Sequence, residues 1–528
     1  MDERNNLPQL PKGWAWTTIE EILQALESGG RPKGGAKGIT QGVPSIGGEH
    51  LLYKGSFDFS QTRYVPEEYY EKMTRGKIAK NDVLVVKDGA TTGKTSFVSE
   101  DFPFGKAAVN EHAFILRVFR DLTNPKYLYF WMQSPFGQRC VGDNFQGRAQ
   151  GGITSSFTKN SHFPLPPLPE QHRIVAKIEE LFSDLDADVA ALKKAQAQLK
   201  RYRQAVLKAA VEGTLTAEWR AANAGTIEPA SALLERIRAE RATLGAVPRA
   251  RPARGVNGGM GGDHKGAPLR VSDAAGLGEL PEGWWWARVR EISAMIQYGT
   301  SEKANEDSSG FPVVRMGNIQ EGGISFEALK YLPTDSPHLS EFILEDGAVL
   351  FNRTNSAELV GKTAVYKRRH PRAVFASYLI RVKVDKDAYH PDMLSFFINS
   401  FHGRRNIGSV VSQQVGQANV NGTKLAQMPI PLPPLAEQQQ IVAEVERRLS
   451  VADEVERTVD ASLKQAERLR QSILKRAFAG KLVPQDPNDE PAERLVERIR
   501  AARDLTGITK SVRSGKHRAT QSQRKKSR

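Results

Sequence analysis

The chain has 528 residues, which at about 150 residues per domain predicts three or four domains and excludes a single compact fold. Lysine and arginine outnumber aspartate and glutamate by 75 to 60, so a polyanion such as nucleic acid is a reasonable partner. One cysteine excludes an internal disulfide and a cysteine-based zinc site, and neither a signal segment nor a membrane span stands out, so we expect a cytoplasmic protein.

The first segment, residues 1–165, is rich in glycine, proline and aromatic residues. It contains the aromatic motif Leu-Pro-Lys-Gly-Trp-Ala-Trp at 10–16, near its start, and mainly apolar runs at 82–86 and 114–118 that are typical of strands. Turn residues separate these runs. We predict a globular domain of mixed α/β structure over residues 1–165.

The next segment, residues 166–245, contains a long predicted helix. Apart from Pro169 at their start, residues 169–212 hold no proline or glycine; Pro166 and Pro167 precede them, and Gly213 follows as a stop. Steps of four and three from Ile174 meet apolar residues everywhere except Asp188, which indicates a coiled-coil seam. The predicted seam consists of Ile178, Leu181, Leu185, Leu192, Ala195, Leu199, Tyr202, Val206 and Ala209.

Two basic segments have the composition of disordered chain, namely a linker at 246–278 and a tail at 508–528. Residues 501–528 carry a net charge of +8 and residues 246–270 carry +4, which leaves +3 of the total +15 for the rest of the chain. The basic balance therefore gives only minor support to a nucleic-acid partner, through non-specific attraction to phosphate.

The remaining segments repeat the first two. The aromatic opening recurs at 280–286, and Pro-Pro-Leu-Pro-Glu-Gln at 166–171 recurs as Pro-Pro-Leu-Ala-Glu-Gln at 433–438. We predict a second globular domain at 279–430 and a second spacer region at 431–507, whose helix covers 436–479 with a seam that includes Val455 and Leu469. The fold class is α+β, with two mixed α/β domains alternating with two helices that pair as an antiparallel coiled coil, in a pseudo-twofold tandem duplication.

Several motifs imitate catalytic sites. Gly89 to Thr95 resembles a phosphate-binding P-loop, but only three residues separate its glycines and the second copy lacks the first glycine. Asn124-Pro125 and Pro391-Asp392 are better interpreted as helix starts than as methyltransferase or nuclease motifs. No pair of histidines has the spacing of a zinc site. We predict neither a catalytic nor a metal site.

The alternation of a Gly-Trp-x-Trp opening, a variable domain, a Pro-Leu-Pro-Pro-Leu-x-Glu-Gln turn and a long helix, all given twice, resembles the specificity subunit of type I restriction-modification systems. The resemblance covers nearly the whole chain. It implies that each globular domain is a target recognition domain that reads one half of a bipartite, asymmetric DNA sequence, and that the paired helices set the gap between the halves.

The resemblance also implies partners. Two methyltransferase subunits that bind S-adenosylmethionine, and two restriction subunits that use ATP and Mg²⁺ as motor and nuclease, would carry the chemistry. This chain would be a non-catalytic recognition subunit that binds double-stranded DNA and holds no cofactor directly.

For contact with DNA we select polar side chains in predicted loops after strands or turns, although each such residue is more often a solvated surface group. The selected residues are Lys87, Lys94, Arg148, Lys159, Arg353, Lys362, Arg404 and Gln417. The tryptophans of the two openings are expected to be core anchors: Trp14, Trp16, Trp284 and Trp286. The alternative function is a coiled-coil scaffold or protein-binding adaptor, which would bind random DNA only weakly and lose it in salt.

Overall fold

The computed structural model describes residues 7–35, 38–147, 151–243, 279–320, 322–337, 339–356, 359–414 and 417–505. It divides into two compact units: unit 1 contains residues 1–192 and 460–528, and unit 2 contains residues 193–459. The predicted linker at 246–278 and the predicted tail at 508–528 lie outside the described residues. No helix in the described part of the chain is long and apolar enough to cross a membrane.

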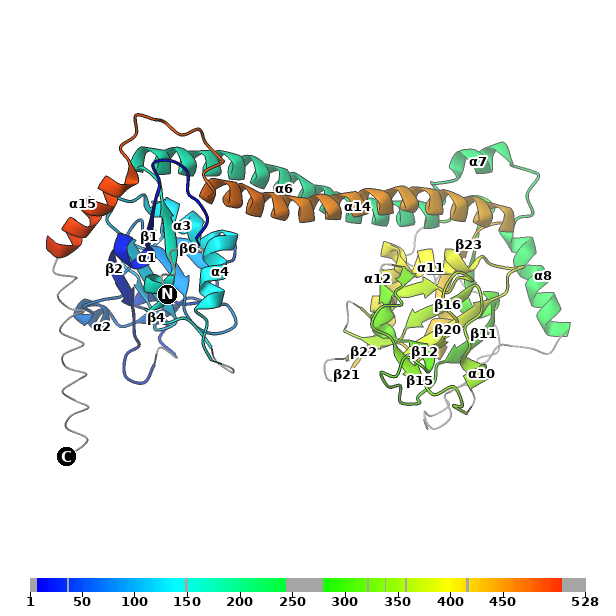
Figure 1. Cartoon of the computed structure of the whole chain (residues 1–528). Helices are drawn as coiled ribbons and strands as arrows, with labels where there is room; N and C mark the ends of the chain where they lie inside the picture. The colour runs from blue at the N-terminus through cyan, green and yellow to red at the C-terminus, as the bar shows by residue number, and fades with distance from the viewer. Residues whose placement is uncertain are drawn as a thin grey trace. The chain divides into compact units, whose positions relative to one another are not determined.

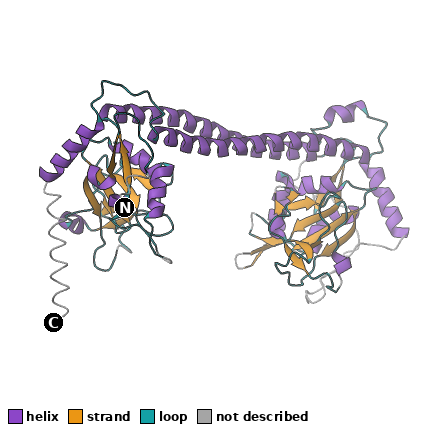
Figure 2. Ribbon diagram, in the orientation of Figure 1, coloured by secondary structure: helices purple, strands orange, loops and turns teal. Residues whose placement is uncertain are grey.

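Unit 1 consists of a mixed α/β domain, the expected first recognition domain, and parts of both long helices (Figures 1 and 2). Its main sheet has the order β2-β8-β5-β6, its second sheet has the order β4-β3-β7, and β1 pairs with β9. The elements are β1 (Ala15–Thr18), α1 (Ile19–Ile22), β2 (Leu23–Ser28), β3 (Val43–Ile46), β4 (Arg63–Val65), α2 (Glu67–Lys72), β5 (Val83–Val86), β6 (Thr95–Phe97), β7 (Ala108–Val109), β8 (Ala113–Val118), α3 (Pro125–Gln133), α4 (Pro135–Asp143), α5 (Phe157–Asn160), β9 (His162–Leu165) and α15 (Ala492–Leu505).

Unit 2 repeats this topology, with sheets β11-β20-β16-β18 and β15-β12-β19 and the pair β10–β23. It adds the small sheets β13-β14 and β17-β22-β21. The elements are α7 (Ala217–Ala222), α8 (Ala230–Thr243), β10 (Trp285–Arg288), α9 (Val289–Ile292), β11 (Ser293–Tyr298), β12 (Phe311–Val314), η3 (Met316–Asn318), β13 (Ile319–Gln320), β14 (Gly323–Ile324), β15 (Lys330–Leu332), α10 (Leu339–Phe342), β16 (Ala348–Asn352), β17 (Thr354–Asn355), β18 (Thr363–Val365), β19 (Val374–Phe375), β20 (Leu379–Val384), α11 (Pro391–Asn399), α12 (Phe401–Val410), β21 (Ser412–Gln414), β22 (Gln417–Asn419), α13 (Gly422–Gln427) and β23 (Pro429–Leu432).

The two recognition domains share one hydrogen-bonding frame although their sequences differ. The β2–β8 and β11–β20 pairs both have an irregular register after their first residue, at Leu23 and at Ser293. In both second sheets the central strand has one antiparallel and one parallel neighbour. The predicted mixed α/β class and the internal duplication are therefore confirmed. The two domains resemble each other more in their backbone hydrogen bonds than in their side chains.

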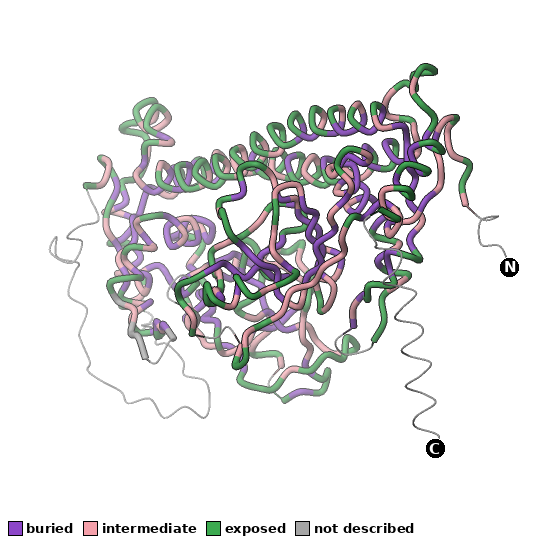
Figure 3. The backbone as a smooth tube through the Cα atoms, turned by 90° about the vertical axis from the view of Figure 1, so that its left-hand side faces the viewer, coloured by how far each residue is buried: buried purple, intermediate pink, exposed green. Residues whose placement is uncertain are grey.

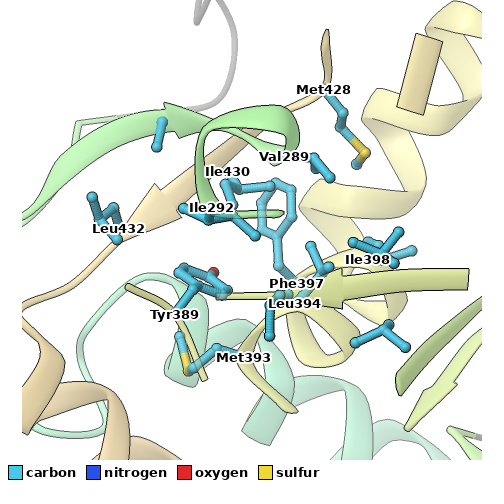
Figure 4. Packing of buried hydrophobic residues seen from close by; sticks show 14 of the residues in the cluster. Val289, Ile292, Tyr389, Met393, Leu394, Phe397, Ile398, Met428, Ile430 and Leu432 are labelled. Carbon is cyan, nitrogen blue, oxygen red and sulfur yellow. The ribbon is translucent and has the colours of Figure 1, made fainter. Parts of the chain in front are cut away.

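Strand alternation builds the core of each domain. In β5, Val83 and Val85 join the cluster that contains the residues of α3, whereas Leu84 and Val86 join a separate cluster with Ile46 of the second sheet. Successive side chains of a strand point to opposite faces, so one four-residue strand serves both clusters. Unit 2 repeats the helix-side cluster, where α11 packs against α9 and β23 around Tyr389 (Figure 4).

The long helices are α6 (Leu168–Val211) and α14 (Leu435–Phe478), each of 44 residues and each one residue earlier than predicted. In unit 1, Arg470 of α14 pairs with Asp186 of α6. In unit 2, Arg203 of α6 pairs with Asp453 at 2.6 Å and with Glu456 at 2.7 Å. In both units the two helices therefore lie side by side and are joined by ion pairs.

Most apolar residues of the two predicted seams are buried or half-buried, but three are exposed. Leu185 and Val206 are buried as expected, but Tyr202, Val455 and Leu469 are 42%, 43% and 49% exposed. At these three places the residue that lies against the partner helix is the next one, and it is charged: Arg203, Glu456 and Arg470. Figure 3 shows how exposed and less exposed residues alternate along these helices.

Charged residues can occupy seam positions for a physical reason. Arginine and glutamate have long aliphatic stems, so they can cover apolar surface while their charged ends form ion pairs across the helix pair. Each charged seam residue directly follows an exposed apolar residue, so the apolar pattern of the sequence points to the wrong one of the two. The same shift removes the break at Asp188, which is exposed, because Val189 takes its place.

The short helices α8 and α15, which follow α6 and α14 along the chain, each complete the core of one domain: α15 that of the first domain and α8 that of the second. In unit 1, the amide N–H of Ala492 in α15 donates to the carbonyl of Gly13 at 2.9 Å, and in unit 2 Ala230 in α8 donates to Gly283 at 3.0 Å. The apolar side of α15 is buried in the core of unit 1, and that of α8 in the core of unit 2. The core of each domain is therefore completed by a helix from the other half of the chain.

The repeated Trp and Glu-Gln motifs form a buried bracket at the base of each recognition domain. The ring N–H of Trp14 donates to Glu170 Oε2 at 3.0 Å, and that of Trp284 donates to Glu437 Oε2 at 2.8 Å. Both indoles are buried, as predicted, whereas Trp16 and Trp286 are only half-buried. The bracket fixes the first strand of the domain to the start of the long helix.

The two brackets differ in how the glutamate is satisfied, which leads to a prediction. Glu437 Oε1 accepts from Thr216 at 2.7 Å and from Arg220 at 3.0 Å, whereas Glu170 Oε1 has no hydrogen-bond partner among the described residues. Burial raises the pKa of Glu170 above its ordinary value. Glu437→Gln should cost about 2–3 kcal/mol because it leaves a half-buried Arg220 without its charge partner.

Glu170→Gln is the matched control and should cost less than about 1 kcal/mol, because an amide oxygen can still accept from Trp14 and no buried charge remains. The thermal unfolding midpoints of the two variants measure the difference. Equal destabilisation by both substitutions would contradict this account of the two brackets.

Candidate nucleic-acid interface

The central strand of each main sheet ends in a cation held by the same backbone bonds. The N–H of Lys87 donates to the carbonyl of His112 at 2.9 Å, and Ile153 donates to the carbonyl of Lys87 at 2.7 Å. In unit 2, Arg353 donates to Tyr378 at 3.1 Å and accepts from Val420 at 2.9 Å. Lys87 and Arg353 are therefore structurally equivalent.

The second cation of each domain lies in the turn that follows the central strand. Gly93 and Gly361 adopt φ of +89° and +83°, which glycine tolerates, and they place Lys94 and Lys362 at the end of the turn. A strand follows in both domains, β6 and β18, whereas a P-loop leads into a helix. Each motif is therefore a turn between two strands, which agrees with the rejection of a P-loop from its glycine spacing.

Aromatic rings hold three of these four cations in place. The ammonium of Lys87 lies 5.4 Å from the ring centre of Phe114, and that of Lys94 lies 4.6 Å from Tyr53, whose ring is largely exposed. The guanidinium of Arg353 lies 4.9 Å from the ring of Tyr298. A cation over an aromatic face keeps its charge and a defined position, which suits contact with phosphate.

The other predicted contact residues have different settings. Arg404 is half-buried, burial lowers its pKa, and its Nη1 donates to the carbonyl of Val360 at 2.6 Å, so it supports the turn that carries Lys362. Lys159 lies on α5 and pairs with Glu20 at 3.6 Å. Gln417 starts β22, next to β17, and Arg148 lies outside the described residues.

The structure therefore brings Lys87 with Lys94 to one end of the main sheet in unit 1, and Arg353 with Lys362 to the same end in unit 2. In unit 2 a cavity of about 600 Å³ adjoins Lys362. It is lined by Met316, Gly317, Ile319, Gln320, Gly323, Ile324, Ser325, Asn352, Leu359 and Lys362.

The sequence analysis missed a polar cluster beside Lys87. His112 Nδ1 lies 2.6 Å from Asp88 Oδ1, and His112 Nε2 lies 3.5 Å from Glu111 Oε1. Arg31 Nε pairs with the same Glu111 oxygen at 2.7 Å. Asp88 could have been selected from the sequence, because it directly follows Lys87 at the end of a predicted strand. Arg31, Glu111 and His112 could not, because they are distant in sequence and meet Asp88 only in the fold.

The described residues contain no group of three or more histidine, cysteine, aspartate or glutamate side chains arranged to hold a metal ion. Asn124 and His390 are the N-caps of α3 and α11, where their side chains accept from the amides of Lys126 and Asp392. The helix-start interpretation of both motifs is confirmed.

Comparison with known families gives one match on both halves of the chain. The model of the type I restriction modification DNA specificity domain matches residues 11–201 and 281–465, which together exceed two thirds of the chain. Both matched segments contain a recognition domain and most of the long helix that follows it.

Individual relatives agree. The specificity subunit of the type I restriction enzyme EcoKI from Escherichia coli strain K12 is 24% identical over 96% of this chain and 98% of its own length. The EcoBI specificity subunit from Escherichia coli is 33% identical over 45% of this chain and 50% of its own length. A chain solved in a study of assembly and conformational transition of the type I R-M system has the same fold, with a TM-score of 0.62 at 18% identity, covering 90% of this chain and all of that one.

Proposed function

Because this chain belongs to the family of type I restriction modification DNA specificity domains, we propose that it is the subunit that selects the DNA sequence on which a type I restriction-modification complex acts. Each recognition domain reads one half of a bipartite, asymmetric target in double-stranded DNA. The observation that carries the proposal is the duplicated backbone frame with unlike side chains, since an asymmetric target needs two similar readers of different specificity.

The cations at the ends of the central strands support this role. Lys87 with Lys94, and Arg353 with Lys362, offer each domain two positive groups at one sheet end. Phosphate contacts of this kind fix the orientation of a protein on the duplex but carry no sequence information. Arg404 acts through the turn of Lys362, so we assign it a positioning role.

The paired helices suit a spacer. In both units α6 and α14 lie side by side and are joined by cross-helix ion pairs, and an antiparallel coiled coil of this length would serve as a stiff spacer. In the proposed complex it sets the gap between the two half-sites and offers docking surface to two methyltransferase subunits and two restriction subunits.

We place the chemistry on those partners. S-adenosylmethionine binds to the methyltransferase subunits, and ATP and Mg²⁺ to the restriction subunits, while this chain contributes recognition alone. Membership in the family of type I restriction modification specificity domains supports this division. So does the finding that the two motifs similar to methyltransferase and nuclease motifs, at Asn124-Pro125 and Pro391-Asp392, are helix starts.

Sequencing of methylated adenines in host DNA, with and without the gene for this chain, tests the proposal. We expect a single bipartite motif with a fixed gap to lose its methylation when the gene is removed and to regain it when the gene is restored. Methylation that is unchanged by the deletion would refute the recognition role and would favour the protein-binding adaptor.

A further inference from the structure

The two recognition domains allow a comparison inside one molecule, because equivalent backbone positions can be identified from their hydrogen bonds. Asp88 follows Lys87 just as Thr354 follows Arg353, and His112 and Tyr378 each supply the carbonyl that accepts from that cation's amide. Asp88 bridges to Gly152, and Thr354 pairs with Asn419 of β22. The pairs Asp88/Thr354 and His112/Tyr378 therefore occupy the same places on one frame.

The side chains on this frame fall into two kinds. The cations Lys87 and Arg353 are retained, as are Lys94 and Lys362, so they serve a task common to both domains. The neighbouring positions are replaced by chemically unlike residues: a carboxylate and an imidazole in unit 1, a hydroxyl and a phenol ring in unit 2. A shared cation suits the phosphate backbone, which is the same in every sequence, and unlike neighbours suit bases, which are not.

We infer that Asp88 and His112 in the first domain, and Thr354 and Tyr378 in the second, are specificity-determining residues that contact base edges in the major groove. The inference rests on the proposed function. It assigns to Asp88 an exocyclic amino group, the N4 of cytosine or the N6 of adenine, as its hydrogen-bond donor.

The geometry of unit 1 supports this assignment. One oxygen of Asp88 contacts His112 Nδ1 at 2.6 Å, and a carboxylate has further acceptor sites on both of its oxygens. Both side chains are more than a third exposed, so a ligand can reach them. A carboxylate that faces DNA is repelled by phosphate, so a hydrogen bond from a base amino group is the contact that gives the acid a role there.

Unit 2 presents a different surface at the same place. Tyr378 is 51% exposed, and Thr354 carries a methyl group beside its hydroxyl. Apolar contact of this kind suits the C5 methyl of thymine, which only one base displays in the major groove. The two domains thus offer an acceptor and an apolar surface respectively.

The experiment exchanges the pairs. The full complex is assembled with wild-type chain, with the double variant Asp88→Thr, His112→Tyr, or with the reciprocal Thr354→Asp, Tyr378→His. Each complex selects from two libraries of DNA duplexes, one with the first half-site randomised and the second fixed and one with the reverse, and the bound duplexes are sequenced. Asp121→Asn is the matched control, because it neutralises an exposed carboxylate of unit 1 near the opposite end of β8.

We expect the first double variant to change the preferred base at one position of one half-site only, and the reciprocal variant to change the other half-site only. The base discrimination lost at that position should be roughly 5- to 150-fold, the value of one good base contact. Asp121→Asn should select the wild-type sequence. Thermal midpoints near wild type will show that the variants fold.

Three results would overturn the inference: unchanged base preference in both double variants, relaxed preference spread over both half-sites, or uniform loss of binding to every duplex. In each case wild-type selection of a bipartite sequence would leave the proposed function intact. Failure of the wild-type complex to select any sequence would instead refute the proposed function.

Discussion

Inserting four residues into α6 after Leu192 should lengthen the gap between the two methylated half-sites by about two base pairs while leaving both half-sites unchanged. A helix rises 1.5 Å per residue, so four residues add about 6 Å, and stacked base pairs are about 3.4 Å apart. A matching insertion after Lys464 keeps the helices paired, because the register of Asp186 with Arg470 places Lys464 opposite Leu192.

A seven-residue insertion at the same two points is a sharper version, since a whole heptad keeps the seam in phase, whereas four residues shift it. It should lengthen the gap by about three base pairs. Four residues added after Leu505, beyond the last helix of unit 1, should leave the gap as it is. Adenine methylation mapped across a genome measures all three variants, and an unaltered gap in both helix variants would refute the spacer role.

Truncation of the chain after Ala479 should unfold unit 1 and spare unit 2. It removes α15, whose Leu495, Val496 and Ile499 are buried in the core of unit 1. Each of these side chains is worth about 2–5 kcal/mol when its burial is lost, and whole domains are stable by only about 5–15 kcal/mol. Every residue of the main core cluster of unit 2 lies between 193 and 459, so that cluster keeps all its contacts.

Hydrogen exchange read peptide by peptide distinguishes the units. We expect β5 and β8 to lose their protection in the truncated chain while β16 and β20 keep theirs. Leu495→Ala should give a milder loss in unit 1, and Leu505→Ala, which alters an 89% exposed side chain, should give none. Protection lost equally in both units would show that α15 is not specific to unit 1.

Features carried by local pattern were predictable from the sequence. Proline before each long helix and glycine after it mark the ends to within one residue, because those residues restrict or extend the backbone locally. The apolar runs at 82–86 and 114–118 became β5 and β8, since consecutive apolar residues bounded by turns suit a strand buried on both faces.

Features that depend on distant partners were not predictable. The choice between Tyr202 and Arg203 at the seam depends on Asp453 and Glu456, which lie some 250 residues away. The site is a similar case: Lys87 could be selected as a cation after a strand, but His112 reaches Asp88 only because β8 lies beside β5. Neither pairing leaves a trace in the local sequence.

The short ribbons β1–β9 and β10–β23 have a consequence for evolution. Ala15 is paired with Leu165, and Trp285 with Leu432, so each recognition domain leaves the framework and returns to it through two neighbouring strands. A foreign segment that replaced residues 19–161 or 289–428 would need ends that meet the ribbon and apolar side chains that pack on the long helices and on α15 or α8. Recombination between related genes at these two junctions would then change one recognition domain in one step while the other domain keeps its sequence.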